Sequence, residues 1–264
     1  MSQDDCLATY PPLNTLKPVA ENIWIVDGPV IRFGIPGLKF PFPTRMTVVR
    51  CASGDLFIHS PTPLTPALRA EIDREGRVRD IIGPNRIHYW WIPDWQAAFP
   101  DAAIYLAPGI RAQAKGRIDF EGRPLDRSTG YPWDDEIATL PVLGSYMTEV
   151  VFFHRPSRTL ILTDLMENFE PAKIGAGLAR YLSWIGGVGP PHGGLPRDLR
   201  LTFTWRHRAE LRAAVETMLA WHPERIVIAH GAWHPADGTE ILREAFCWLL
   251  RPRTAGMASR DRPS

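Results

Sequence analysis

The sequence predicts a layered α/β fold in which helices pack against β-sheets, and three observations support this prediction. Short apolar runs rich in β-branched residues recur along the chain, as expected for buried strands. Stretches with helical spacing of apolar residues follow several of these runs. Hairpins come first, then strands alternate with helices, then hairpins and helices return. This order is typical of sheets covered by helices.

Most of the predicted strands lie in the first half of the chain. They are expected over residues 21–28, 46–51, 55–59, 78–82 and 103–107, whereas the Gly- and Pro-rich residues 33–43 are expected to form a long loop. A helix is predicted from Thr65 to Gly76. Thr65 suits the N-cap, Pro66 the first helical position, and Gly76 the C-terminal stop. A shorter helix is expected over residues 94–99.

The second half of the chain continues the same alternation. Residues 148–154 and 159–163 flank Arg155-Pro156-Ser157-Arg158, which predicts a hairpin. Residues 208–221 and 239–250 have helical character, and residues 225–229 predict a last buried strand. Residues 174–200 predict a partly helical excursion broken by Gly and Pro. Because no internal repeat is visible, we expect one domain over residues 16–250, an N-terminal arm over 1–15 and a flexible C-terminal tail over 251–264.

Composition narrows the classes of function. Of the 264 residues, 45% are hydrophobic and 22% are charged, as in ordinary globular proteins, and the net charge of +1 argues against binding to nucleic acid or to an anionic membrane. No apolar run approaches the ~20 residues that span a bilayer, and no signal peptide is visible. The three cysteines are scattered without a CxxC pair, which favours a reduced, cytoplasmic protein. The sequence does not indicate an oligomeric state.

Several apolar strands end in an ionisable residue. Asp164 follows the strand at 159–163, His230 follows the strand at 225–229, and His59 ends the strand at 55–59. His88 comes shortly after the strand at 78–82. Because a strand end fixes a side chain while the following loop leaves it accessible, these four groups are candidates for one site that binds a metal.

The order of elements over residues 16–250 resembles the metallo-β-lactamase fold, an αββα sandwich. Residues 19–25 look like the opening strand of that family, and residues 55–60 look like the strand that usually ends in Asp-Thr-Gly. Residues 151–164 look like the hairpin that ends in the metal-bridging Asp, and residues 226–231 like the strand that ends in the last metal-binding His. The resemblance therefore implies a site around Asp164 and His230.

The departures from the family pattern predict a reduced metal site. The family signature is His-x-His-x-Asp-His, and in the direct register its four residues are replaced by Asn85, Ile87, Tyr89 and Trp90. A shift of one residue would let His88 occupy a ligand position. The middle His of the family falls at or near Ser145. The chain thus resembles an uncharacterised branch with a degenerate motif, which we expect to bind at most one ion.

Each candidate also has a structural interpretation. Asp164 is either a ligand or a turn residue, and His230 is either a ligand or a core histidine bonded to a carbonyl group. His88 stands among aromatic residues that either pack it or line a ligand pocket. His59 either supplies an imidazole ligand or bonds the loop that follows it. His154, at the opposite end of the predicted hairpin from Asp164, is expected to be a surface turn residue.

Two functions remain open at this stage. The first is a metallo-hydrolase-like enzyme in which His88, Asp164 and His230, with His59 as a further ligand, hold one Zn or Fe ion and act on a small ester, amide or phosphoester. The second is a non-catalytic relative that serves as a ligand-binding or protein-interaction module. The altered signature favours the second function, and the placement of Asp164 and His230 at strand ends favours the first.

Overall fold

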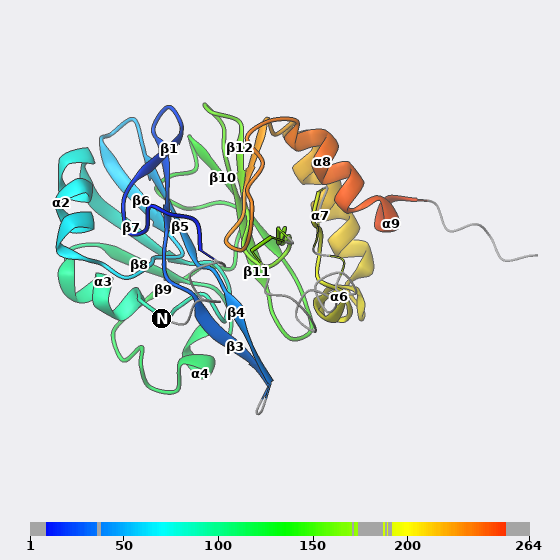
Figure 1. Ribbon diagram of the computed structural model, residues 1–264, viewed down its shortest axis with the longest axis horizontal. Coiled ribbons are helices and arrows are strands. Elements are labelled where there is room, and N and C mark those ends of the chain that lie inside the picture. The colour runs from blue at the N-terminus through cyan, green and yellow to red at the C-terminus, as the bar shows by residue number, and fades with distance from the viewer. Residues whose placement is uncertain are drawn as a thin grey trace, which may run out of the picture.

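The computed structural model describes residues 9–35, 38–170, 172–173, 187, 189 and 192–251. Two sheets lie face to face at the centre of the molecule, and a layer of helices covers the outer face of each (Figure 1). The chain is therefore an αββα sandwich, as predicted. The first half of the chain builds the blue and cyan half of Figure 1, and the second half builds most of the green-to-red half.

The first sheet has seven strands in the order β1-β2-β5-β6-β7-β8-β9. In this order, neighbouring strands from β1 through β2 and β5 to β6 are antiparallel, and neighbouring strands from β6 to β9 are parallel. Its strands are β1 (Lys17–Ala20), β2 (Ile23–Asp27), β5 (Arg45–Arg50), β6 (Asp55–His59), β7 (Arg77–Gly83), β8 (Ala103–Leu106) and β9 (Arg123–Pro124). The parallel strands require crossover connections, which the helices on this side supply.

The second sheet has four strands in the order β10-β11-β12-β13. Its strands are β10 (Ile137–Val142), β11 (Glu149–His154), β12 (Thr159–Ile161) and β13 (Arg225–Val227). The predicted hairpin is confirmed, because β11 and β12 pair antiparallel. The last strand pairs parallel with β12, so the chain segments that carry Asp164 and His230 leave the sheet at the same edge.

Strand β11 shows how the two layers share a core. Val150 and Phe152 pack with the side chains of the first sheet, whereas Val151 and Phe153 pack with the helices behind the second sheet. This alternation follows from the two-residue period of a strand. The rings of Phe57 and Phe152 meet edge to face across the sandwich, with centroids 5.2 Å apart. All five side chains are buried, so both faces of the second sheet are covered.

Helices α2 (Pro66–Glu75), α3 (Ile92–Ala98) and α4 (Ile110–Ala114) lie on the side of the first sheet (Figure 1). Helices α6 (Arg197–Thr204), α7 (Arg208–Ala220), α8 (Gly238–Ala245) and α9 (Cys247–Leu250) lie on the side of the second. Helix α2 begins as predicted, because the Thr65 hydroxyl accepts a hydrogen bond from the backbone N of Leu68. The predicted last helix is divided into α8 and α9 at Phe246.

The prediction of a long loop over residues 33–43 is wrong. A two-stranded hairpin, β3 (Ile31–Ile35) and β4 (Leu38–Phe42), occupies this region and extends away from the sandwich (Figure 1). Glycine and proline reduce strand propensity, but a two-stranded sheet has only edge strands, where proline is tolerated. Pro41, for example, stands opposite Arg32. The predicted excursion over residues 174–200 lies largely outside the described residues, as does the predicted tail after Arg251.

Residues 9–15 lie against the body of the protein. Thr9 is buried, and the Thr15 hydroxyl donates to the Glu71 carboxylate of α2 at 2.8 Å. We propose residues 16–250 as the bounds of the sandwich domain. Within the described part of the chain, no helix is long and apolar enough to cross a bilayer.

Candidate metal centre

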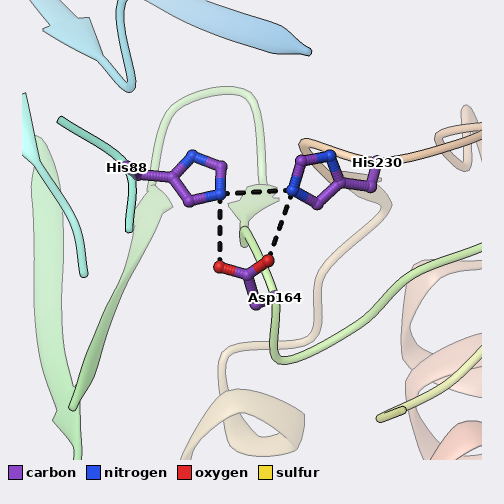
Figure 2. A group of neighbouring side chains, drawn as sticks. All are labelled: His88, Asp164 and His230. Carbon is purple, nitrogen blue, oxygen red and sulfur yellow. Dashed lines mark hydrogen bonds and ion pairs between the residues drawn. The ribbon is translucent and has the colours of Figure 1, made fainter. Parts of the chain in front are cut away.

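Three of the four predicted site residues meet at one end of the two sheets. Asp164 follows β12, His230 follows β13, and His88 lies in the loop between β7 and α3. Their side chains point toward one another (Figure 2). One nitrogen or oxygen atom of each lies within 4.8 Å of the other two, so the three residues form a group that could hold a metal ion. All three side chains are largely buried, with exposed fractions of 10% for His88, 3% for Asp164 and 5% for His230.

The contacts within this group have nearly equal lengths. His88 Nε2 lies 3.2 Å from Asp164 Oδ2, and His230 Nε2 lies 3.3 Å from Asp164 Oδ1. The two imidazole Nε2 atoms lie 3.2 Å apart (Figure 2). Each carboxylate oxygen therefore faces one imidazole, and the two imidazoles face each other.

The turn that carries Asp164 is held by a buried carboxylate. Glu149 at the start of β11 is fully buried and accepts hydrogen bonds of 2.8 Å from the backbone N atoms of Thr163, Asp164 and Leu165. These three amides follow the end of β12 and have left the strand ladder. Glu149 thus supplies the acceptors that the sheet no longer provides.

His230 is held by the first sheet. Its Nδ1 lies 2.7 Å from the carbonyl oxygen of Pro43. Arg45 Nη1 donates to the carbonyl oxygens of Ile228 and Gly231, on either side of His230, at 2.8 Å each. The Arg45 guanidinium pairs in turn with Asp27, and both groups are buried. The contacts between the two sheets therefore fix the backbone and the ring of His230.

His88 is held by two neighbouring polar side chains. Its Nδ1 lies 2.6 Å from the Ser60 hydroxyl oxygen. The Asn85 side-chain oxygen accepts hydrogen bonds from the backbone N of Ile87 at 2.9 Å and from that of His88 at 3.2 Å. Ser60 has a positive φ of 53°, an uncommon conformation for a residue other than glycine, so its hydroxyl is presented from a strained turn directly after β6.

Asn85 also reaches Asp164. Its Nδ2 donates to Asp164 Oδ2 at 2.5 Å and to the Thr163 hydroxyl at 2.9 Å. The orientation of the amide is determined by its neighbours, because its oxygen accepts from two backbone N–H groups and its nitrogen faces a carboxylate. Asn85 is fully buried, and it connects the loop of His88 to the turn of Asp164.

The electrostatics of the group are strongly perturbed. Burial lowers the pKa of His230, but the hydrogen bond and the charge of Asp164 outweigh burial and raise this pKa to about 9. Burial raises the pKa of Asp164, but His88 and His230 hold it well below its usual range. Burial, followed by the charge of Asp164, raises the pKa of Glu149 to about 7. Such opposing shifts among neighbouring groups are typical of functional sites.

The structure does not bring His59 into this group. His59 is buried, its ring packs edge to face on Phe152 with centroids 5.4 Å apart, and its Nε2 has no hydrogen-bond partner. Burial, with a smaller contribution from His88, lowers the pKa of His59 to about 3. His59 is therefore a neutral imidazole beside the site, and its role as a ligand stays a prediction.

The structure also shows where His154 and Ser145 lie. His154 does lie at the opposite end of the β11–β12 hairpin from Asp164, but it is not a surface residue. It is 2% exposed, and its Nδ1 bonds the Ser157 hydroxyl at 2.8 Å. The Ser145 hydroxyl donates to the carbonyl oxygen of Trp205 at 2.9 Å.

Solved structures with a similar fold are metallo-β-lactamases and a related protein. The structure of DIM-1 metallo-β-lactamase exposed to ceftazidime is 14% identical and has a TM-score of 0.56, over 87% of this chain and 94% of that chain. The mono-zinc form of the metallo-β-lactamase FIM-1 from Pseudomonas aeruginosa is 9% identical with a TM-score of 0.52, over 90% and 96%. A metal-soaked flavodiiron core from Synechocystis sp. PCC6803 is 12% identical with a TM-score of 0.58, over 89% and 60%.

These similarities show that the chain has the metallo-β-lactamase fold. A family model described as a domain of unknown function, DUF4336, matches residues 20–174, which is more than half of the chain. The chain belongs to this family. A comparison with curated proteins gave no match. The expectation of an uncharacterised branch of the metallo-β-lactamase fold is consistent with these findings.

Proposed function

We propose that this protein is a metallo-hydrolase-like enzyme with a mononuclear metal site formed by His88, Asp164 and His230. The observation that supports this proposal is the spacing of the donor atoms: one ligand atom of each residue lies within 4.8 Å of the other two, and the two imidazole Nε2 atoms lie 3.2 Å apart. Two metal bonds of about 2.0–2.1 Å that meet at a tetrahedral angle hold their donor atoms about 3.3–3.4 Å apart. The spacing and the donor set of two imidazoles and a carboxylate both fit Zn or Fe.

The hydrogen bond of His230 supports the same proposal. A carbonyl oxygen only accepts hydrogen bonds, so the bond to Pro43 places the ring proton of His230 on Nδ1. In the neutral ring Nε2 then carries a lone pair, which faces the acceptor oxygens of Asp164. A proton on Nε2 or a metal ion between the two groups would relieve the repulsion between this lone pair and the carboxylate. A backbone carbonyl at the second nitrogen is the usual setting of a metal-binding histidine.

The proposal is limited to one ion because of Asn85. Asp164 Oδ2 already accepts the Asn85 amide at 2.5 Å, where the family signature would place a histidine ligand. An amide N–H group cannot ligate a cation, and the amide is held in this orientation by its own acceptor contacts. Asn85 therefore supplies no ligand with which Asp164 could bridge a second ion.

A divalent ion bound here would lower the pKa of a bound water and polarise an ester, amide or phosphoester oxygen. The residues of the chain have distinct tasks in the proposal. Asp164 and His230 are buried and fixed by the fold, so they hold their positions through the reaction. His88 is the most exposed member of the group, so in this proposal it lies nearest to the substrate. The substrate in this proposal is a small molecule with a hydrolysable ester, amide or phosphoester group.

The test uses two buried histidines as a matched pair. Untagged protein is purified, loaded with Zn²⁺ or Fe²⁺, dialysed and analysed for bound metal. The wild type is expected to hold one equivalent, His230→Ala none, and His154→Ala one. His154 serves as the control because it is buried like His230 but lies at the opposite end of the β11–β12 hairpin from Asp164. Two results would contradict the proposal. One is a wild type that binds two equivalents of metal and loses both in His230→Ala, and the other is a wild type that binds no metal. Metal-dependent cleavage of chromogenic esters and phosphoesters then tests the activity.

A second candidate function is a non-catalytic ligand-binding or protein-interaction module. The observation that favours it is the use of Asn85 and Ser145, at two signature positions, for hydrogen bonds within the protein. A protein that binds no metal, but whose melting temperature rises with a small-molecule ligand, would support this function instead.

We further propose a cytoplasmic location. Cys51 and Cys247 are both free thiols, which suits a reducing compartment. Cleavage of the chain by a protease that is restricted to the cytoplasm, or labelling of both thiols in intact cells, tests this location.

A further inference from the structure

We propose that Glu149 is a positioning residue of the metal site. It orients the Asp164 carboxylate and is not itself a ligand. The inference rests on the proposed function and deepens it. Glu149 is the one fully buried acidic residue among the described residues, with an exposed fraction of 0%. A buried carboxylate is expensive unless it is fully hydrogen-bonded, so its presence calls for a specific role.

The hydrogen bonds of Glu149 indicate that role. One oxygen accepts from the backbone N of Thr163, and the other accepts from those of Asp164 and Leu165. All three bonds are 2.8 Å long, and the three donors are consecutive. Three consecutive N–H groups can point at one carboxylate only if the chain makes a tight turn. The carboxylate therefore determines the backbone conformation at Asp164.

The backbone of Glu149 is held in place without help from the proposed metal ligands. Glu149 starts β11 opposite Val142, so its backbone is held by the sheet and not by the turn that it binds. The Thr163 hydroxyl contacts Glu149 as well and also accepts the Asn85 amide, which reaches Asp164. The carboxylate of Asp164 is thus oriented from its backbone by Glu149 and from its side chain by Asn85.

The expected consequence is a loss of metal affinity when the turn loosens. In Glu149→Gln, one of the two acceptor oxygens becomes an NH₂ group that faces backbone donors, so at least one of the three bonds is lost. Substituting groups that orient metal ligands lowers metal affinity by about 10–100-fold. We therefore expect Glu149→Gln to bind Zn²⁺ at least about tenfold more weakly and to change the absorption spectrum of bound Co²⁺, which reports ligand geometry.

The control is Glu136→Gln. Glu136 also accepts a backbone N–H, that of Ala52, through both oxygens at 2.9 and 3.1 Å, but it lies away from the site. This variant is expected to keep wild-type Zn²⁺ affinity and the wild-type Co²⁺ spectrum. If Glu149→Gln does not fold, Thr163→Val keeps the three backbone bonds of Glu149 and removes the hydroxyl contacts with Glu149 and with the Asn85 amide. Its effect on Zn²⁺ affinity is expected to have the same sign but a smaller size.

A second measurement separates this inference from the proposed function. In metal-free protein, hydrogen exchange at the amides of Thr163, Asp164 and Leu165 and the ¹³C shift of the Asp164 carboxyl carbon are followed by NMR. Both should change in Glu149→Gln and stay as in wild type in Glu136→Gln. Unchanged signals, or unchanged Zn²⁺ affinity, overturn the role of Glu149. Wild-type protein that binds neither Zn²⁺ nor Co²⁺ overturns the metal site, and the NMR signals still decide whether Glu149 positions Asp164.

Discussion

Asn85 Nδ2 donates a hydrogen bond of 2.5 Å to Asp164 Oδ2, and this contact joins the loop of His88 to the turn that carries Asp164. Both residues are buried, so the amide hydrogen bonds a carboxylate that water does not reach freely. A hydrogen bond to a charged group in such surroundings contributes more than a neutral one. We therefore expect Asn85 to stabilise the arrangement of His88 and Asp164.

The first prediction follows from this contact. Asn85→Asp places a second acceptor against Asp164, so two buried carboxylates face each other and the free energy of unfolding is expected to fall by about 2–4 kcal/mol. Added Zn²⁺ should recover much of this loss, because a cation screens the two carboxylates. Urea unfolding with and without Zn²⁺ measures both effects.

The control for that change is Asn22→Asp. The Asn22 side-chain oxygen accepts two hydrogen bonds from Arg50, and an aspartate can accept the same bonds. This variant should unfold within about 0.5 kcal/mol of wild type, as surface substitutions usually do. Equal losses in the two variants would mean that the Asn85–Asp164 contact has no special role.

The comparison of sequence and structure shows which parts of the site could be predicted. Apolar strands end directly before Asp164 and His230, and the parallel pairing of β12 with β13 brings those ends together. His88 joins them from a loop. The sequence alone did not fix the position of His88, since residues 85–90 match the family signature only after a shift of one residue. His59 ends a strand in the same way but does not join the group, so a strand end alone does not determine where a side chain points.

The residues that hold the site could not be found from sequence patterns. Asn85 contacts Asp164 across 79 positions, Arg45 contacts the carbonyl of Ile228 across 183 positions, and Glu149 contacts Asp164 across 15. Nothing in their local sequence distinguishes them from other polar residues near strand ends. One usable signal was available for Glu149, which begins an otherwise apolar run, Glu149–His154, that is buried on both faces. A charged residue at the start of such a run must have a partner.

The second prediction concerns chelation. A metal that binds only the folded state stabilises it by RT ln(1 + [L]/Kd), which is about 2.7 kcal/mol at a hundredfold excess of free metal over Kd. For a chain of this length that raises the melting temperature by roughly 5–10 °C, at about 2–4 °C per kcal/mol. Chelation should reverse the shift in wild type. Asp164→Asn should show no difference between metal-loaded and chelated protein in differential scanning calorimetry.

That experiment also separates the two interpretations of Asp164. If Asp164 served only as a turn residue, asparagine could replace it, and the melting temperatures of the chelated wild type and the variant would be alike. A wild-type melt that responds neither to chelator nor to added Zn²⁺ or Fe²⁺ would favour the binding-module function.

The third prediction tests the connection between the sheets at His230. Arg45→Lys keeps the charge but cannot bond Asp27 and the carbonyl oxygens of Ile228 and Gly231 together, since lysine lacks the planar array of donors. Breaking buried paired groups costs about 3–5 kcal/mol, so a marked loss of stability is expected together with weaker Zn²⁺ binding. Arg50→Lys is the control, because Arg50 makes a partly exposed pair with Glu75. A loss of stability without any change in metal affinity would show that Arg45 does not position His230.

The fourth prediction concerns pH and a site far from the metal group. Asp80 in β7 is 5% exposed, and its Oδ1 has no hydrogen-bond partner. Burial raises the pKa of Asp80 from 3.8 to about 6, although Arg79 and Arg123 oppose the rise. A carboxyl group whose pKa is raised by folding binds its proton more tightly in the folded state. Its contribution to stability is therefore fully present below about pH 4 and is lost as the pH rises through about 6.

Asp80→Asn removes this dependence. The variant should match wild type near pH 4 and should be more stable than wild type at pH 7–8, by about 2 kcal/mol for a shift of this size. Asp101→Asn, at an exposed position that pairs with Arg77 at 3.8 Å, is the control, and its stability should run parallel to that of wild type. Urea unfolding at half-unit intervals from pH 4 to pH 8 provides the measurement. A loss of stability in Asp80→Asn at pH 8 would contradict this prediction. It would mean that the Asp80 carboxylate has a favourable partner in solution.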